Sequence, residues 1–230
     1  MIDLHSHILP KMDDGSKSPE ETLALLTQLG QQGITTLAAT PHFYAQEAPE
    51  VFLRRRMEAF ENMPVLPEGA PEILLGAEVA YFPGMGNCDA LIPLQIGNTK
   101  LLLIEMPFGD WSDRVIEDVC EIPVQLGLLP VLAHVNRYPG KKQFPKYKDA
   151  LLDAGVFFQC NAEAFLTLKT RRWALDLMKK GYIHFLGSDC HNTTTRYPRW
   201  DEAKAVIEKK FGPGFLENLD QNARELLEHK

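Results

Sequence analysis

The stretch MIDLHSH at residues 1–7 decides how the chain is interpreted, because it places two histidines two residues apart. Its apolar start predicts a β-strand over residues 2–7. Residues two apart on a strand point to the same face, so His5 and His7 would present their imidazole rings side by side. Neutral imidazole is the commonest side-chain metal ligand, and the pair therefore indicates a metal site if further ligands lie nearby.

The composition predicts an ordinary soluble domain. A length of 230 residues suits one α/β barrel, and we expect a single domain over residues 1–230. The formal net charge of −7 argues against a general nucleic-acid binder. Four cysteines without a Cys-x-x-Cys pair indicate reduced thiols in a cytoplasmic protein. We expect no signal peptide and no membrane insertion, because the sequence has no leader pattern and no apolar run of about 18 residues.

Apolar runs rich in Val, Ile and Leu alternate with longer amphipathic segments, as in parallel sheets covered by helices. Strands are expected at residues 2–7, 34–40, 73–78, 101–105, 129–134, 156–161 and 183–188. Helices are expected from the N-cap at Ser18 to Gly33, at 50–62, 112–126, 145–154, 164–180 and 201–210, and as one or two short helices from Gly214 onward. Seven strands alternating with helices predict a closed parallel barrel. An open doubly wound sheet is the alternative, weakened because no G-x-G-x-x-G follows the first strand.

Six of the seven expected strands end in, or run directly into, a side chain that can bind a metal ion. These side chains are His5, His7, His42, Glu78, Glu105, His134, Asp189 and His191, and Asp14 lies in the loop after the first strand. The carboxyl ends of barrel strands meet at one rim, where the active site of such a fold lies. Any one of these residues alone is more often a hydrogen-bonded structural group, but their common position predicts a metal centre.

The chemistry of this set indicates more than one ion. Glu78 and Glu105 each end an apolar run, where a buried carboxylate is costly without a cation or a full set of hydrogen bonds. The set has more donors than one tetrahedral zinc ion accepts, which indicates two or three metal ions bridged by carboxylates. Mixed imidazole and carboxylate donors favour manganese, iron or zinc over magnesium or calcium alone.

The motifs that carry these residues resemble those of the PHP (polymerase and histidinol phosphatase) superfamily. They are H-S-H at 5–7, D-D-G at 13–15, T-P-H at 40–42, G-A-E at 76–78, I-E at 104–105, A-H-V-N-R at 133–137 and S-D-C-H at 188–191. Within the superfamily, I-D-L-H-S-H-I-L-P at 2–10 and L-I-E-M-P-F at 103–108 are similar to bacterial tyrosine phosphatases encoded with capsule and exopolysaccharide genes.

The resemblance implies an α/β fold, a distorted seven-stranded (β/α)7 barrel of the PHP type, with three divalent metal ions, often Mn²⁺, with Fe or Zn as alternatives. It assigns His5, His7, Glu78 and Asp189 to one ion, Glu78, Glu105 and His134 to a second, and Asp14, His42 and His191 to a third. It also matches Arg137 to an arginine that contacts phosphate, with Arg196 as a second candidate. The implied reaction is hydrolysis of phosphotyrosine on a bacterial tyrosine autokinase that regulates capsular and exopolysaccharide synthesis.

In such a reaction the two arginines would clamp the phosphoryl oxygens, and His42 or Asp14 would supply a proton to the leaving oxygen. The sequence does not choose between these two proton donors. The aromatic residues Phe108, Trp111, Tyr138 and Tyr197 follow ligand segments and are candidates for the mouth of the site. The basic run at 54–56 is either a solvated helix face or a contact for an acidic partner.

Three other interpretations stay open. The chain can be a PHP-type small-molecule phosphoesterase such as a histidinol-phosphatase, or a non-catalytic metal-binding module. It can also be a cysteine-dependent tyrosine phosphatase, because Cys190 and Arg196 have the C-x5-R spacing of that class. The residues between them include no glycine that would let backbone amides wrap a phosphate, which argues against this third interpretation.

Overall fold

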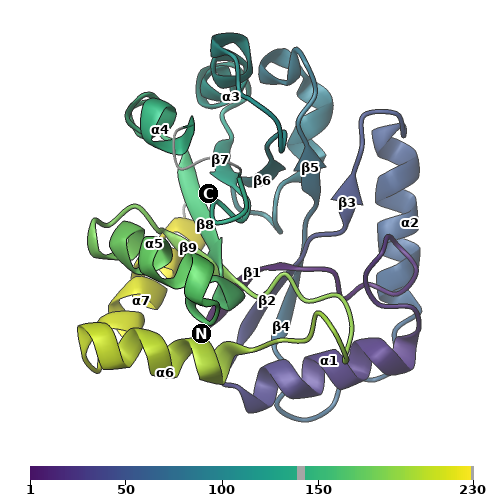
Figure 1. The fold of residues 1–230 in the computed structure, drawn as a ribbon. Coiled ribbons are helices and arrows are strands. Elements are labelled where there is room, and N and C mark those ends of the chain that lie inside the picture. The colour runs from purple at the N-terminus through teal and green to yellow at the C-terminus, as the bar shows by residue number, and fades with distance from the viewer. Residues whose placement is uncertain (139–142, 229–230) are drawn as a thin grey trace.

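The computed structural model describes residues 1–138 and 143–228. The strands are β1 (Ile2–Ser6), β2 (Thr36–Ala39), β3 (His42–Phe43), β4 (Glu72–Leu75), β5 (Glu78–Ala80), β6 (Leu101–Glu105), β7 (Leu129–Leu132), β8 (Phe157–Asn161) and β9 (Phe185–Gly187). The α-helices are α1 (Pro19–Gln31), α2 (Pro49–Glu61), α3 (Asp113–Leu126), α4 (Gln143–Asp153), α5 (Leu168–Lys179), α6 (Trp200–Phe211) and α7 (Phe215–Glu228). Three short 3-10 helices are η1 (Met85–Asn87), η2 (Asp89–Leu94) and η3 (Ala162–Phe165). The strands gather at the centre and the helices lie around them (Figure 1).

The strand pairs among the described residues are all parallel, and the strands form two sheets, within each of which they follow chain order. Three strands pair in the order β1-β2-β4, and six pair in the order β3-β5-β6-β7-β8-β9. The first and last strands then meet: the backbone N–H of Asp189 donates to the oxygen of His5 at 2.8 Å, and that of His7 donates to Cys190 at 2.9 Å. The expectation of a distorted α/β barrel of parallel strands is confirmed.

The distortion of the barrel arises from two interrupted strands. The expected strand at 34–40 is shortened to β2, and the separate strand β3 follows after Thr40 and Pro41. The expected strand at 73–78 divides into β4 and β5 around Gly76 and Ala77. The backbone still pairs across the interruption, because the N–H of Glu78 donates to Pro41 at 3.0 Å. A Cβ at Gly76 would lie 2.8 Å from Ile96 Cγ1, so glycine allows this close approach. Glu78 therefore begins β5, and the expectation that it ends a strand was wrong.

The helices follow the expected capping signals with shifted boundaries. The Ser18 side chain accepts from the backbone N–H of Glu21 at 3.3 Å, and Gly33 after the helix has a φ of 79°. The helix expected at 164–180 is wrong in part, because η3 and α5 replace it with a break between them. The last segment forms one helix, α7, and residues 229–230 of the expected tail lie outside the described residues.

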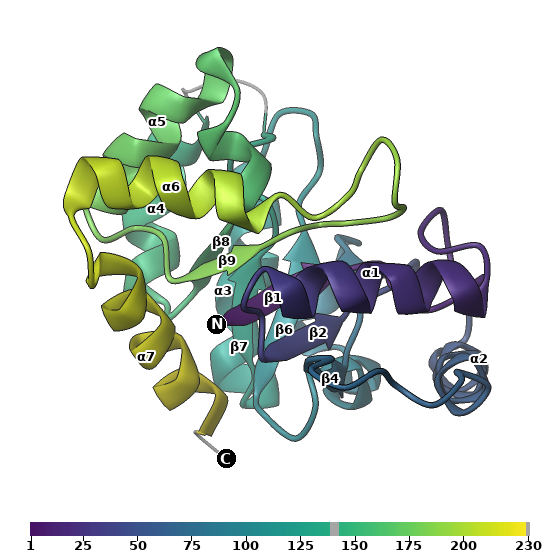
Figure 2. The same cartoon turned by 90° about the horizontal axis from the view of Figure 1, so that it is seen from below.

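Apolar residues of the strands form two buried clusters. Leu102, Ile104 and Leu132 belong to the larger buried cluster, whereas Leu103 and Val131 belong to a smaller one that includes Ala223 of α7. Figure 2 shows α7 beside the N-terminus of β1. In the described part of the chain, no helix has both the length and the apolar character that a membrane span requires.

Candidate metal centre

The side chain of Glu78 lies at the middle of a cluster of imidazole rings. Its Oε2 is 3.2 Å from His5 Nε2, 3.3 Å from His7 Nε2 and 3.0 Å from His42 Nδ1. Its Oε1 is 2.8 Å from His134 Nε2. Only 1 % of the Glu78 side chain is exposed, so its charge is compensated by these groups and not by water.

Asp189 forms a second junction from the opposite side of the barrel. Its Oδ1 is 3.5 Å from His7 Nε2, 3.7 Å from His5 Nε2 and 3.6 Å from His191 Nδ1. Glu105 joins the cluster through its Oε1, which is 3.3 Å from His134 Nε2. The two junctions bring residues from both ends of the chain into one site.

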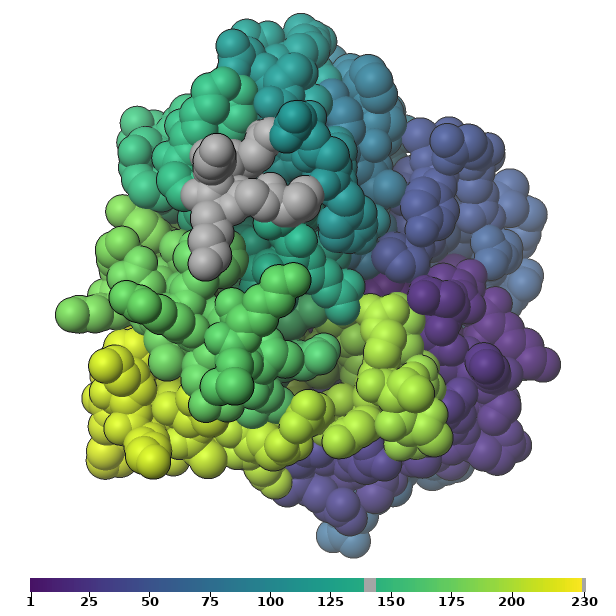
Figure 3. Space-filling view, in the orientation of Figure 1, coloured from purple at the N-terminus to yellow at the C-terminus, as the bar shows by residue number. Residues whose placement is uncertain are grey.

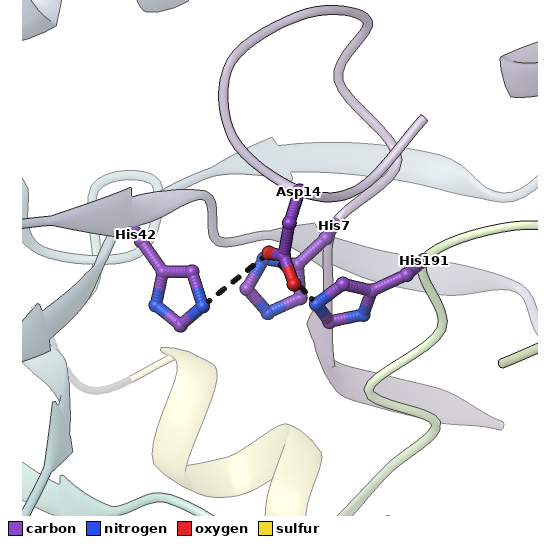
Figure 4. A group of neighbouring side chains, drawn as sticks. All are labelled: His7, Asp14, His42 and His191. Atoms are coloured by element: carbon purple, nitrogen blue, oxygen red, sulfur yellow. Dashed lines mark ion pairs between the residues drawn. The ribbon is translucent and has the colours of Figure 1, made fainter. Parts of the chain in front are cut away.

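The third part of the cluster is the most open to solvent. Asp14 Oδ1 lies 3.2 Å from His191 Nε2 and 3.7 Å from His42 Nε2. Figure 4 shows the Asp14 carboxylate directed between the rings of His42 and His191, with His7 behind it. The Asp14 side chain is 64 % exposed, whereas that of His191 is 1 % exposed. The structure therefore brings all nine side chains predicted as ligands into one connected cluster.

The chemistry of the cluster fits divalent cations. The Nε2 atoms of His5 and His7 lie 3.0 Å apart, so at least one of them presents a lone pair to the other. In the part of the chain that the structure describes, the buried atoms His42 Nδ1 and His191 Nε2 face carboxylate oxygens of Glu78 and Asp14 without forming a well-aligned hydrogen bond, and His134 Nδ1 has no hydrogen-bond partner. Donor atoms within 4.8 Å of one another form three groups: His7, Asp14, His42 and His191; His5, His7 and Asp189; His42, Glu78 and Glu105. Such mixed nitrogen and oxygen donors suit first-row transition metals.

Charge compensation is visible in the pKa values of the histidines. Burial alone would lower the pKa of His7, but hydrogen bonds with Asp13 and Glu78 outweigh burial and raise that pKa to about 10. For His134 the carboxylates of Glu105 and Glu78 likewise outweigh burial and raise the pKa to about 9. Protons thus occupy positions between imidazole and carboxylate where a cation would replace them, so metal binding and proton release are coupled.

Asp13 is a functional residue that the sequence did not separate from its neighbour Asp14. Its Oδ2 accepts from His7 Nδ1 at 2.7 Å and from the His42 backbone N–H at 2.9 Å. Its Oδ1 accepts from the Gly15 backbone N–H at 2.8 Å. A carboxylate that holds Nδ1 as N–H directs Nε2 of the His7 ring toward the cluster, where a cation that displaces the Nε2 proton would meet a lone pair.

The buried side-chain amide of Gln159 in β8 orients the imidazole ring of His5. Gln159 Oε1 accepts from the His134 backbone N–H at 2.6 Å, which fixes the orientation of the amide because a backbone N–H can only donate. The same oxygen lies 3.3 Å from His5 Nδ1, which must therefore carry the proton and leave Nε2 as the lone pair. Gln159 Nε2 donates to Asn161 Oδ1 at 3.0 Å, and Asn161 Nδ2 donates to Asp189 Oδ2 at 2.8 Å. The chain of amides thus orients His5 and Asp189 together.

Replacing Gln159 with leucine is expected to weaken metal binding about 10- to 100-fold, the usual cost of losing a group that orients a metal ligand. Competition with a chromophoric chelator measures the affinity, and circular dichroism checks the fold. Gln159→Glu keeps the accepting oxygen and is expected to recover part of the affinity. Wild-type metal affinity in the leucine variant would show that the amide does not position His5.

The backbone itself is unusual at two positions in the cluster. His134 has a φ of 31° and Asp189 a φ of 53°, in the left-handed region that non-glycine residues rarely adopt. A Cβ at Gly187 would lie 2.7 Å from His5 Cβ, so glycine lets β9 approach β1 closely. These local conformations turn the side chains that follow β7 and β9 inward.

Two arginines meet at Asp189. Arg137 Nη2 lies 2.5 Å from Asp189 Oδ2, and Arg196 Nη2 lies 2.8 Å from Asp189 Oδ1. Arg196 Nη1 also lies 3.5 Å from Asp14 Oδ2. Each arginine side chain is about one third exposed, so both guanidinium groups keep N–H donors at the open side of the cluster.

The loop from Cys190 to Arg196 does not form a phosphate cradle. Asn192 Oδ1 accepts the backbone N–H groups of Thr195 at 2.7 Å, Thr194 at 3.0 Å and Arg196 at 3.2 Å. The Cys190 residue is 1 % exposed, and burial, followed by the charge of Asp3, raises the pKa of its thiol. The amides are occupied and the thiolate is disfavoured, so the geometry argues against a cysteine nucleophile.

Aromatic rings border the cluster. Phe108, half exposed, stacks on His134 with ring centroids 6.0 Å apart and an interplanar angle of 14°. Tyr44, which the sequence did not single out, stacks on His42 at 5.5 Å and 27°. Tyr138 is buried beside His134 and accepts from the Met106 backbone N–H, which indicates a packing role. Trp111 contacts Tyr138 edge-on at 5.0 Å, away from the exposed rings.

A groove of about 680 Å³ lies beside Arg137. It is lined by Asn136, Arg137, Tyr138, Asn161, Glu163, Ala164, Thr167, Lys169, Thr170 and Trp173. Arg137 and Asn161 contact Asp189, so the groove begins at the cluster itself. Tyr197, the last predicted aromatic residue, lies on a separate small pocket beside Asp189 and Arg196.

Comparison with known proteins places the chain among capsule-synthesis proteins. A family model described as capsular polysaccharide synthesis, CpsB/CapC, matches residues 1–228. The tyrosine-protein phosphatase YwqE of Bacillus subtilis is 31% identical over 239 residues, with 100% of this chain and 92% of YwqE covered. The tyrosine-protein phosphatase CpsB of Streptococcus pneumoniae is 31% identical over 234 residues, with 92% of this chain and 91% of CpsB covered.

Solved structures with a similar fold include proteins of the same kind. A crystal structure from work on YwqE and CpsB, described there as unique metal-dependent tyrosine phosphatases, superposes with a TM-score of 0.80 at 28% identity. The match covers 100% of this chain and 95% of that one. The histidinol phosphate phosphatase of Lactococcus lactis, solved with zinc, L-histidinol and phosphate, gives a TM-score of 0.52 at 16% identity, covering 90% of this chain and 92% of that one. This second likeness concerns the fold alone.

Proposed function

Because this chain belongs to the CpsB/CapC family of capsular polysaccharide synthesis, we propose that it is a metal-dependent protein-tyrosine phosphatase, a phosphoric monoester hydrolase. The observation that carries the proposal is the convergence of five imidazoles and four carboxylates around Glu78 and Asp189. We also propose that residues 1–230 form a single domain.

The proposed centre holds three divalent ions, with Mn²⁺ as the first choice and iron or zinc as alternatives. His5, His7, Glu78 and Asp189 would hold one ion, Glu78, Glu105 and His134 a second, and Asp14, His42 and His191 a third. Bound ions of this kind activate water and neutralise charge on phosphoryl oxygens. The spacing of the donor atoms supports the grouping of His5, His7 and Asp189 and that of Asp14, His42 and His191. Glu78 and Glu105 are grouped with His42 by this spacing, and His134 is placed with them by its contacts to both carboxylates.

Arg137 and Arg196 are proposed to bind the phosphoryl oxygens. Both are anchored on Asp189 and directed to the open side of the centre, so they reach the substrate without a rearrangement of the cluster. A guanidinium offers several N–H donors in one plane, which matches the oxygens of a phosphoryl group. Because the donors are in place before the substrate arrives, they stabilise charge that develops in the transition state.

The leaving group of phosphotyrosine is a phenol with a pKa of about 10, so it needs less protonation than an alkyl alcohol. His42 and Asp14 lie 3.7 Å apart at the open side of the centre and are the proposed source of that proton. The exposed rings of Tyr44 and Phe108 stand over His42 and His134, where an aryl group can stack against them.

The proposed substrate is a phosphotyrosine protein, with a bacterial tyrosine autokinase of capsular and exopolysaccharide synthesis as the physiological partner. The relatives YwqE and CpsB are named tyrosine-protein phosphatases, which supports the substrate class. The four cysteines are free, as expected in the cytoplasm, where we propose that the protein acts.

The assay that tests this function compares a phosphotyrosine peptide with histidinol phosphate on the same metal-loaded sample. We expect hydrolysis of the peptide, loss of activity after treatment with a chelator, and full activity in Cys190→Ser, because the buried thiol takes no part. Metal content determined on each sample links activity to occupancy. Preference for histidinol phosphate would favour the small-molecule phosphoesterase, and activity that survives metal removal but not Cys190→Ser would favour the cysteine mechanism.

A further inference from the structure

A second groove, of about 720 Å³, carries an unusual concentration of positive charge. Lys169, Arg172 and Lys179 of α5 and Lys210 at the end of α6 line it, and we call these four residues the basic groove. The three α5 residues are spaced three and seven apart, which places them on one face of the helix. The chain as a whole has a formal net charge of −7, so this surface is opposite in sign to the molecule around it.

The cations of the basic groove are not neutralised within the described residues. No carboxylate oxygen there lies within 4.0 Å of the charged nitrogens of Lys169, Arg172, Lys179 or Lys210. The acidic residue that lines the groove, Asp176, is paired with Lys180 at 2.7 Å. Arg171 also lines the groove, but its guanidinium donates to the carbonyl oxygens of Phe165 and Leu166. The basic groove therefore keeps its charge available for a ligand.

The basic groove shares part of its lining with the groove that begins at the metal centre. Lys169 and Trp173 line both, and the other end of the first groove is formed by Arg137 and Asn161 at Asp189. Figure 3 shows the green surface of α5 on the same face as the yellow-green loop at residues 192–199. A polypeptide with one residue in the centre therefore has neighbouring residues that extend along α5.

We propose that the basic groove binds an acidic stretch of the substrate polypeptide next to its phosphotyrosine. The proposal rests on the proposed phosphatase function and names the substrate class more narrowly, as phosphotyrosine flanked by Asp and Glu. Positive charge along the path from the centre attracts such a sequence and disfavours a basic one, so it acts on substrate choice. Contacts of this kind weaken with salt because the charges are exposed.

The basic run at 54–56, the other candidate for an acidic partner, does not form such a surface. Arg55 pairs with Glu47 at 2.7 Å, and Arg56 is buried with its Nη1 donating to the Gly76 oxygen at 2.8 Å. Arg54 is exposed on α2, away from α5 (Figure 1). Arg54 and the exposed Lys100 therefore supply a matched control for changes in net charge.

The experiment compares the double variant Arg172→Glu/Lys179→Glu with the control Arg54→Glu/Lys100→Glu, which has the same net charge. Two phosphotyrosine peptides of equal length serve as substrates, one flanked by Asp and Glu and one by Ser and Ala. We expect kcat/KM of the groove variant to fall about tenfold on the acidic peptide through KM, and to change less than about twofold on the neutral peptide. The control variant should match wild type on both. Equal losses on both peptides, or no loss on the acidic one, would overturn the proposal.

Binding of the unphosphorylated acidic peptide, followed by fluorescence anisotropy at low salt, tests the groove without hydrolysis. Wild type should bind it more tightly than the neutral peptide, and the groove variant should lose the difference. Equal binding of the two peptides to wild type would refute the groove even if both phosphopeptides are hydrolysed. Failure of metal-loaded wild type to hydrolyse either phosphopeptide would instead refute the phosphatase function.

Discussion

Glu78→Gln is expected to lower both metal content and phosphatase activity more than any other single substitution in the protein. The Glu78 carboxylate lies within 3.3 Å of nitrogens from four histidines, and glutamine keeps its shape while removing its charge. Loss of about 4 kcal/mol of metal-ion assistance corresponds to a roughly thousandfold fall in kcat. Elemental analysis of the purified variant and steady-state kinetics on a phosphotyrosine peptide measure the two effects.

Glu58→Gln is the matched control, because Glu58 is an exposed carboxylate on α2 outside the centre. It should retain full metal content and activity. Circular dichroism of the Glu78 variant separates a loss of metal from a loss of fold. If the Glu78 variant keeps its metal and its kcat, Glu78 is not a bridging ligand and the proposed division of ligands is wrong.

Arg137→Ala is expected to reduce kcat/KM by about 10²–10³-fold, the usual effect of removing one donor to a developing oxyanion. Metal content should stay at the wild-type level, because Arg196 and Asn161 still contact Asp189. Inhibition by inorganic phosphate should weaken in parallel, since the product presents the same oxygens. Arg137→Lys should recover only part of the activity, because an ammonium group lacks the planar pair of donors.

Arg114→Ala serves as the control, because Arg114 is an exposed arginine of α3 whose pair is Asp118. Loss of metal together with activity in Arg137→Ala would assign the arginine to support of Asp189 and not to phosphate binding. Unchanged phosphate inhibition would lead to the same conclusion. Comparison with Arg196→Ala then shows whether the two arginines act on the same oxygens.

The metal-ligand cluster was predictable because a parallel barrel brings residues at the carboxyl ends of its strands to one rim. Parallel strands carry their carboxyl ends to one rim, so His5, Glu105 and His134 meet although the sequence separates them widely. The interruptions near Pro41 and Gly76 were not predictable in the same way. At Gly76 the apolar run continues through the break from Ile73 to Ala77, and only the folded structure shows the close approach of Gly76 to Ile96.

Residues that orient the ligands were harder to find. Asp13 and Asp14 are adjacent aspartates in one loop, and only the direction of each side chain shows that Asp13 contacts His7 Nδ1. Gln159 is recognisable in the sequence only as a polar residue inside an apolar strand, and its partners His5 and His134 lie on β1 and in the turn after β7. The basic groove combines α5 with the end of α6, so its charge is dispersed in the sequence and concentrated only by folding.

The contact between β1 and β9 that closes the barrel also bears on the order of folding. The Ser188 backbone N–H donates to Asp3 Oδ1 at 2.8 Å across 185 residues of chain, so this contact forms only after nearly the whole sequence is available. Long-range contacts of this kind are slow to form, because the chain between them must be ordered first. His5 and His7 are synthesised first, but their contacts in the cluster require Asp189 and His191 from the end of the chain. The proposed metal ligands from the two ends of the chain therefore come together only when the barrel closes.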